Sequence, residues 1–147
     1  MKLSDTLLEG IIPIIPTPFN EDETIDEAAL RNLVDFACSC GINAGCLPAY
    51  ASEFYKLTDD EKLAVVKIAV HQAAGRIKIV AQSNHPSLRA AIRLAQQNVK
   101  NGAAIISLAV PRIFSLPEDS LMEYLSGFMA AVPETQVLVQ DFNPGGP

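Results

Sequence analysis

The sequence has no tryptophan, only three cysteines, and no long uninterrupted apolar run. A membrane-spanning helix needs about 18 or more consecutive apolar residues, so we expect no membrane partner. The first ten residues, MKLSDTLLEG, have neither the apolar stretch nor the cleavage site of a secretory signal peptide. We therefore expect a cytoplasmic protein.

Positive charge is also scarce, which argues against several kinds of binding site. The chain has 11 Lys and Arg against 17 Asp and Glu, and no basic stripe that would neutralise a nucleic-acid backbone. Cys38, Cys40 and Cys46 have no His or Cys-x-x-Cys pair nearby, so we interpret them as buried small apolar residues and expect no metal site. No glycine-rich phosphate-binding loop is present, which argues against a nucleotide cofactor.

What the chain does contain is an alternation of strand and helix patterns, and we expect residues 1–147 to belong to one domain. Apolar runs of the strand type recur at a spacing typical of βαβ units, at 11–15, 44–47, 77–81, 104–109 and 137–139. Amphipathic segments lie between them. Asp26 and Thr58 with Glu61 predict two helix starts, and Asn101–Gly102 predicts a helix end. The pattern predicts an α/β fold with a parallel sheet.

Two architectures fit this order of elements. One is roughly the first five strands of a parallel (β/α)8 barrel, and the other is a five-stranded doubly wound sheet. The turn after the first strand is not glycine-rich, and no helix follows Val137–Val139 to cover a doubly wound sheet, so the barrel is favoured. One of two alternating sets then faces the barrel interior, either the following residues or their alternating neighbours: Ile12, Ile14, Ile79, Ile106 and Val137.

Candidate site residues follow the strands, where parallel α/β proteins place their sites. Thr17 follows the first strand, and Tyr50, Ala51, Ser52 and Glu53 follow the second. Small residues in such a turn let backbone amides approach a ligand carboxylate, although an ordinary capped turn is the alternative.

Two further polar residues follow later strands. Asp141 follows the fifth strand, and His85 follows the third. A histidine titrates near neutral pH and can act as a general base, but no partner acid or nucleophile is identifiable near His85. We therefore interpret His85 as a loop residue.

Four stretches resemble, in order and spacing, the dihydrodipicolinate synthase and N-acetylneuraminate lyase family. They are GIIPIIPTPFNEDETID, GINAGCLPAYASEFYKLTDDEK, NGAAIISLAVPRIF and VLVQDFNPGGP. The resemblance implies a (β/α)8 barrel and a class I lyase that needs no cofactor. Its partner would be a small 2-oxo acid such as pyruvate, held as a Schiff base on a lysine.

The sequence departs from this family at several site positions. Residues 49–53 read Ala-Tyr-Ala-Ser-Glu where the family has Gly-Thr-Thr-Gly-Glu or Gly-Ser-Thr-Gly-Glu, and Asp141 stands where the family has a proton-shuttling tyrosine. Phe114 and Gly146 replace a tyrosine and an arginine of the synthases. We therefore expect a reaction other than dihydrodipicolinate synthesis. Our hypothesis is that Tyr50 supplies the phenol while Asp141 holds or deprotonates it, the alternative being that Tyr50 only fills space.

The resemblance places the Schiff-base lysine on the sixth barrel strand. The lysines of this sequence fall at its amino terminus, on predicted helices or at the start of a strand, so we expect the 147-residue chain alone to be inactive. The alternative is a non-catalytic half-barrel that folds by pairing with another half. Unpaired strand edges of such a half predict a homo-oligomer.

Overall fold

A parallel sheet in chain order forms the centre of the molecule. The structure is a computed structural model that describes residues 8–111 and 116–141. The strands β1 (Ala44–Leu47), β2 (Lys78–Gln82), β3 (Ile105–Ala109) and β4 (Val137–Gln140) pair in the order β1-β2-β3-β4, every pair parallel. This sequential order is that of a barrel segment and excludes the doubly wound alternative, in which the strand order reverses.

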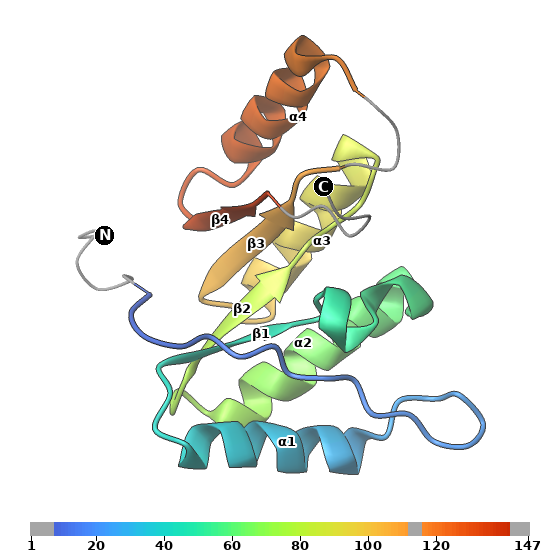
Figure 1. Cartoon of the computed structure of the whole chain (residues 1–147), viewed down its shortest axis with the longest axis vertical. Coiled ribbons are helices and arrows are strands. Elements are labelled where there is room, and N and C mark those ends of the chain that lie inside the picture. Colours follow the sequence, from blue (N-terminus) through green and yellow to red (C-terminus); the bar gives the residue numbers. More distant parts are fainter. Residues whose placement is uncertain (1–7, 112–115, 142–147) are drawn as a thin grey trace.

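Helices alternate with these strands. They are α1 (Glu27–Ser39), α2 (Asp59–Ala73), α3 (Leu88–Lys100) and α4 (Glu118–Ala131). In Figure 1 they follow one another around the sheet in chain order, from α1 at the bottom of the view to α4 at the top. The α/β class and the four later strands of the sequence analysis are confirmed.

The first predicted strand, residues 11–15, is much shorter than expected. Only an isolated bridge forms there, between Ile14 and Cys46. The Ile15 amide donates to the Cys46 carbonyl and the Cys46 amide donates to the Pro13 carbonyl, each at 2.9 Å. Pro13 and Pro16 flank this bridge and have no N–H to donate, so the ladder beside β1 cannot be extended in the usual way.

The helix ends follow the local signals in the sequence. The Asp26 carboxylate accepts a hydrogen bond from the Ala29 amide at 2.9 Å and caps α1. Thr58 and Glu61 form the reciprocal capping box at the start of α2. Gly102, at φ +95°, follows the end of α3 in the left-handed conformation that favours glycine. All three predictions are confirmed.

One face of the sheet packs against the helices. Each of the four helices contributes apolar side chains to this layer. Its strand residues include Leu47, Ile79, Ala81 and Ile106. The buried helical residues are Leu30, Val34, Ala37, Val65, Val66, Ala69, Ala73, Ala91, Ala95, Tyr124 and Phe128. This layer is the main core of the chain.

The opposite face of the sheet, which we call the inner face, carries a second apolar cluster with no helical residue. It is formed by Ala44, Cys46, Ala49, Val80 and Ile105, with Leu8, Ile12, Ile14 and Leu138 packed against them. Of the two alternating sets considered above, Ile12 and Ile14 face inward as members of the first set. On the later strands it is the alternating neighbours Val80, Ile105 and Leu138 that face inward. The set Ile79, Ile106 and Val137 packs toward the helices.

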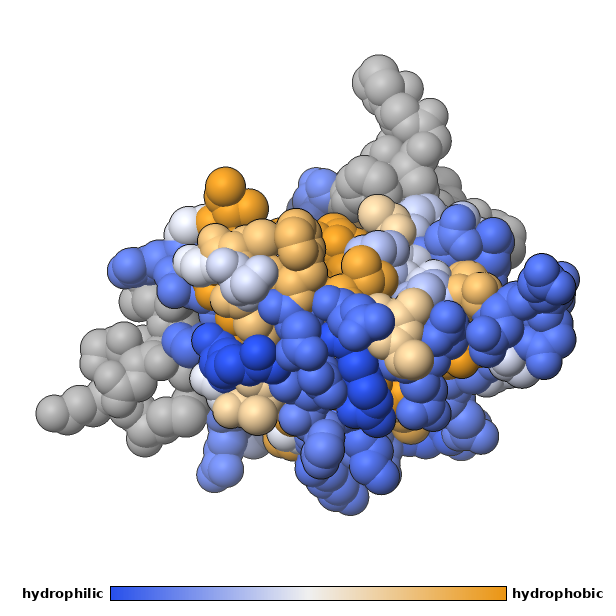
Figure 2. Space-filling view, turned by 90° about the horizontal axis from the view of Figure 1, so that it is seen from below, coloured by the Kyte–Doolittle hydropathy of each residue, from blue (hydrophilic) through white to orange (hydrophobic). Residues whose placement is uncertain are grey.

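The outer surface is mixed in character. Figure 2 shows the molecule from below, where hydrophilic residues cover most of the visible face and an apolar area lies at its upper left. Ile11 and Phe36 are among the large apolar side chains that are well exposed. Of the three cysteines expected to be buried, only Cys46 is; Cys38 is half-buried, and Cys40 is exposed because it lies at the end of α1. Within residues 8–111 and 116–141, no helix has the length and apolar character to cross a membrane.

The capping box allows a direct test of α2. Replacing Thr58 by Ala removes the side-chain oxygen that accepts from the Glu61 amide, so we expect the free energy of unfolding to fall by about 1 kcal/mol. Urea unfolding followed by circular dichroism measures this change. Ser87 at the start of α3 makes no side-chain capping bond, so Ser87→Ala is the matched control and should change stability much less. Equal losses in the two variants would contradict the capping role of Thr58.

Candidate active site

The turn after β1 is anchored by Ser52. Two short 3-10 helices form it, η2 (Tyr50–Ser52) and η3 (Phe54–Lys56). Ser52 is completely buried, and its hydroxyl donates to the Ile15 carbonyl at 2.6 Å while its amide donates to the Ala49 carbonyl at 3.0 Å. Both hydrogens of Ser52 are thus used to hold the turn against the segment that precedes Thr17.

Ala51 and Glu53, the neighbours of Ser52, are more accessible. Ala51 is exposed, and its amide donates to no acceptor within the described parts of the chain. Glu53 has φ +59°, a left-handed conformation that is unfavourable for a side chain with a Cβ, and it separates η2 from η3. Its carboxylate pairs with the Lys56 ammonium at 2.8 Å, and this hydrogen bond raises the pKa of Lys56.

Three aromatic rings surround this turn. Tyr50 lies 5.3 Å from Phe54 and 5.9 Å from Tyr55, measured between ring centroids, and Phe54 and Tyr55 are 6.0 Å apart. The Lys62 ammonium lies 5.8 Å from the centre of the Phe54 ring. Tyr50 is 40% exposed, so it is partly packed by the other rings and partly accessible at the rim of the sheet. The ring contacts of Tyr50 agree with a packing role, and its exposure leaves it accessible to a ligand.

The predicted site residues lie in two parts of the structure: residues 50–53 form one turn beside the segment that leads to Thr17, and Asp141 follows β4 at the opposite edge of the described sheet. Thr17 is buried, and it lies two residues after Ile15, whose backbone bonds to both Cys46 and Ser52. Asp141 is exposed directly after β4, and β2 and β3 lie between β4 and β1 in the sheet. Two further residues of the sequence analysis, Phe114 and Gly146, lie outside the described residues.

A set of neutral polar side chains that the sequence analysis missed lies on the inner face. Gln82, Ser107 and Gln140 each come two residues after an inward residue of their strand, at or near its carboxyl end. We call these three residues the inner polar layer. The Gln82 amide nitrogen donates to the side-chain oxygen of Gln140 at 2.8 Å. A polar residue that interrupts an apolar strand, as Ser107 does, is the signal by which the sequence points to such a layer.

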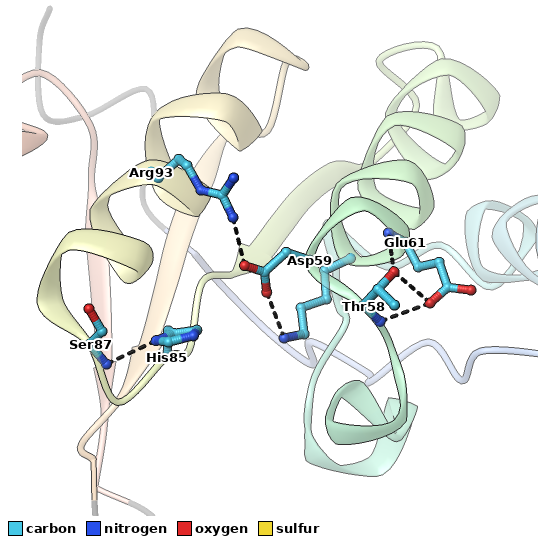
Figure 3. Close-up of polar contacts among 7 residues, drawn as sticks. Thr58, Asp59, Glu61, His85, Ser87 and Arg93 are labelled. Atoms are coloured by element: carbon cyan, nitrogen blue, oxygen red, sulfur yellow. Dashed lines mark hydrogen bonds and ion pairs between the residues drawn. The ribbon is translucent and has the colours of Figure 1, made fainter.

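His85 lies in the loop after β2, and its contacts are local. Its Nδ1 accepts from the Ser87 amide at 2.9 Å (Figure 3), and its carbonyl accepts from the Tyr124 hydroxyl at 2.6 Å. Burial raises the pKa of Tyr124 to about 12, so this phenol stays protonated. The preceding Asn84 accepts from the Ala109 amide at 2.6 Å and ties the loop to β3. These contacts support the interpretation of His85 as a loop residue.

Asp59 begins α2 and links this helix to α3, at the end of the sheet where the Ser52 turn lies. Its two carboxylate oxygens pair with Lys62 at 3.1 Å and with Arg93 at 2.7 Å, and Figure 3 shows Arg93 reaching across from α3. Burial raises the pKa of Asp59, but the hydrogen bond and charge of Lys62, followed by the hydrogen bond of Arg93 and the charge of His85, outweigh it. The pKa is therefore held below its ordinary value of 3.8.

Two of the described lysines, Lys56 and Lys62, follow the carboxyl end of β1, but each is paired with a carboxylate, Lys56 with Glu53 and Lys62 with Asp59. Lys56, Lys62 and Lys67 are on helical segments, Lys100 ends α3, and Lys78 begins β2. A Schiff-base lysine requires a site in which its ammonium is desolvated and its pKa lowered. The part of the chain that the structure describes has no lysine at such a position.

Comparison with known protein families matches residues 7–141 to the family described as the dihydrodipicolinate synthetase family. The chain belongs to this family. The match covers the Ser52 turn, all four strands and the inner polar layer. It confirms the resemblance noted from the sequence and the assignment of the sheet to a (β/α)8 barrel.

Individual members of the family match over most of this chain but less than half of their own length. A 4-hydroxy-tetrahydrodipicolinate synthase of Acidobacterium capsulatum is 36% identical over 89% of this chain and 44% of its own. An L-2-keto-3-deoxyarabonate dehydratase of Azospirillum brasilense is 27% identical over 93% and 45%. The crystal structure of dihydrodipicolinate synthase from Bacillus clausii superposes with a TM-score of 0.89 at 26% identity, covering 97% of this chain and 47% of that one.

The ion pairs of Asp59 predict a pH dependence of stability. Because the pKa of Asp59 is lower in the folded chain than in the unfolded one, its charge stabilises the fold above about pH 4, and this contribution is lost as the pH falls through the folded pKa. The difference in unfolding free energy between the wild type and Asp59→Asn should therefore be largest near pH 7 and shrink toward pH 3. Urea unfolding at a series of pH values measures it.

The neighbouring Asp60 provides the control, because it has no ion pair with any described side chain. Asp60→Asn should show a smaller change of this difference with pH. If the Asp59→Asn difference were constant from pH 7 to pH 3, the ion pairs would not contribute as argued.

Proposed function

We propose that this chain forms the N-terminal portion of a single barrel domain in a class I lyase that acts on pyruvate or another 2-oxo acid. The reaction class is aldol cleavage or dehydration, and dihydrodipicolinate synthesis itself is not what we propose. The observation that carries the proposal is the Ser52-anchored turn at the carboxyl end of β1, beside the inner polar layer, in a chain of this family. The name of the Azospirillum relative, a dehydratase of a 2-keto-3-deoxy acid, supports the choice of substrate class.

In this proposal the turn holds the carboxylate of the substrate. The exposed Ala51 amide, which has no acceptor in the described chain, donates to a carboxylate oxygen. Ser52 contributes by fixing the shape of the turn, because its own hydrogens are used by Ile15 and Ala49. Glu53 holds the left-handed position that lets the chain turn from η2 to η3, and Thr17 closes the site beside it.

We further propose that Tyr50 moves the proton between substrate and catalytic lysine, with Asp141 as its partner. A phenol at the rim of the sheet, 40% exposed, is accessible to a substrate held by the Ala51 amide only one residue away. The lysine would come from a barrel strand that pairs beyond β4, because β4 pairs only with β3 among the described residues. The edge of β4 that has no neighbour among the described strands also offers a surface for a second copy of the chain, so we propose a homo-oligomer as the assembly.

Trapping with borohydride tests the absence of a catalytic lysine from these 147 residues. We expect no covalent adduct when this chain alone is incubated with pyruvate and sodium borohydride, because its described lysines lie on helical segments or at the start of β2. Mass spectrometry measures the adduct, and a polypeptide that joins this chain to the remaining barrel strands is the positive control. A stable mass increase on a lysine of the 147-residue chain would contradict the proposal.

The proposed role of Tyr50 is tested in the same joined polypeptide. Exchange of the methyl hydrogens of pyruvate for deuterium, followed by proton NMR, reports proton transfer without requiring the natural substrate. Tyr50→Phe should slow this exchange by about 100-fold, the usual scale of assistance by a general acid or base. Tyr55→Phe removes a phenol from the same aromatic cluster and should leave the rate nearly unchanged. Near-normal exchange in Tyr50→Phe would assign this ring to packing.

A further inference from the structure

The inner polar layer contains buried acceptors that the fold does not use. Gln82 is 5% exposed and Ser107 is fully buried. The Gln82 side-chain oxygen and the Ser107 hydroxyl oxygen have no hydrogen-bond partner in the described parts of the chain. Most buried polar side chains in proteins are paired, because an unpaired one loses its bonds to water without replacement. Two unpaired oxygens on adjacent strands, at residues paired in the β2–β3 register, therefore call for a ligand.

The chemistry of the layer defines what it can bind. Every buried polar residue of the described chain is uncharged, including Gln82, Ser107 and the nearby Thr17, whose hydroxyl oxygen is also unpaired. A carboxylate offers only acceptors and would face the Gln82 side-chain oxygen, itself an acceptor, without a hydrogen to share. A hydroxyl group offers the hydrogen that the Gln82 oxygen needs, can pair with the Ser107 hydroxyl as donor or acceptor, and brings no charge into a buried site.

The position of the layer links it to the proposed carboxylate site. Leu47 of β1 pairs with Ala81 of β2, so Gln82 lies beside the chain that leaves β1 and enters the Ser52 turn. Thr17 comes two residues after Ile15, whose carbonyl oxygen accepts the hydrogen bond from the Ser52 hydroxyl. A small molecule whose carboxylate is bound by the turn would extend from it toward the inner polar layer.

We propose that Gln82 and Ser107 form a specificity-determining subsite that accepts a hydrogen bond from a hydroxyl group of the bound 2-oxo acid. Gln140 acts as a positioning residue, because its side-chain oxygen accepts from the Gln82 amide and leaves the Gln82 oxygen free for the ligand. This inference rests on the proposed function, since it takes a 2-oxo acid as the ligand. It adds which side chains distinguish a hydroxylated substrate from one without the hydroxyl.

Two probes that differ by one hydroxyl test the subsite. Isothermal titration calorimetry measures the noncovalent binding of 2-oxo-4-hydroxybutyrate and of 2-oxobutyrate to the 147-residue chain. We expect the hydroxylated probe to bind about tenfold tighter to the wild type, the usual scale for one buried hydrogen bond. Gln82→Leu and, independently, the smaller change Ser107→Ala should bring this ratio close to one.

A matched control is available at the other end of the sheet. Gln136 precedes β4, and its side-chain oxygen is likewise buried and unpaired in the described chain. Gln136→Leu removes the same chemical group away from the proposed subsite, so it should keep the tenfold ratio. The thermal unfolding temperature of each variant shows whether it is folded. If Gln82→Leu does not fold, the probe ratio measured with Ser107→Ala alone tests the subsite.

The outcomes separate this inference from the proposed function. Equal binding of the two probes to the wild type, with pyruvate also bound, would overturn the hydroxyl subsite and leave the proposed function intact. A tenfold ratio that persisted in both Gln82→Leu and Ser107→Ala would overturn the assignment to these residues. No binding of pyruvate or of either probe would overturn the proposed function and the subsite together.

Discussion

Parallel hydrogen bonding between neighbouring strands is the constraint on which the rest of this structure depends. Each parallel pair, from β1–β2 to β3–β4, needs a crossover long enough to return the chain to the same end of the sheet, and a helix supplies it every time. Crossovers of the usual right hand place all these helices on the same face. The inner face has no helix on it and is contacted by the segment around Ile12 and Ile14. The rest of that face points toward the interior of the barrel.

The same constraint gathers the candidate site at one end of the sheet. In a parallel sheet all carboxyl ends lie at one edge, so the turn after β1 and the tips of β2 and β4 meet there although they are far apart in the sequence. The hydrogen bond from Ser52 to Ile15 fixes this turn against the preceding segment, and the bond from Gln82 to Gln140 spans the strand between them. The site is thus built on rigid elements, with the aromatic rings of Tyr50, Phe54 and Tyr55 at its rim.

The departures from the family pattern have structural consequences that are now visible. Ser52 stands in a turn where its hydroxyl serves the fold, while the adjacent backbone amide of Ala51 has no acceptor in the described chain. Tyr50 has neighbours in its own turn that pack its ring, so a large side chain is accommodated without entering the core. The chain therefore belongs to the family although the turn after β1 differs in chemistry from the quoted family pattern.

The sequence by itself determined the elements whose causes are local. Asp26 and the Thr58–Glu61 pair specify helix starts, because capping needs only residues within one turn, and four of the five strands follow from apolar runs between such signals. It also placed Thr17 and residues 50–53 after their strands. The tertiary structure alone decided which face of each strand points inward. Ile79 and Val80 are both apolar, as are Ile105 and Ile106, so a strand buried on both faces gives no alternation from which to choose. The inner polar layer became visible only once that choice was made, because its members come from three strands that meet through pairing distant in sequence.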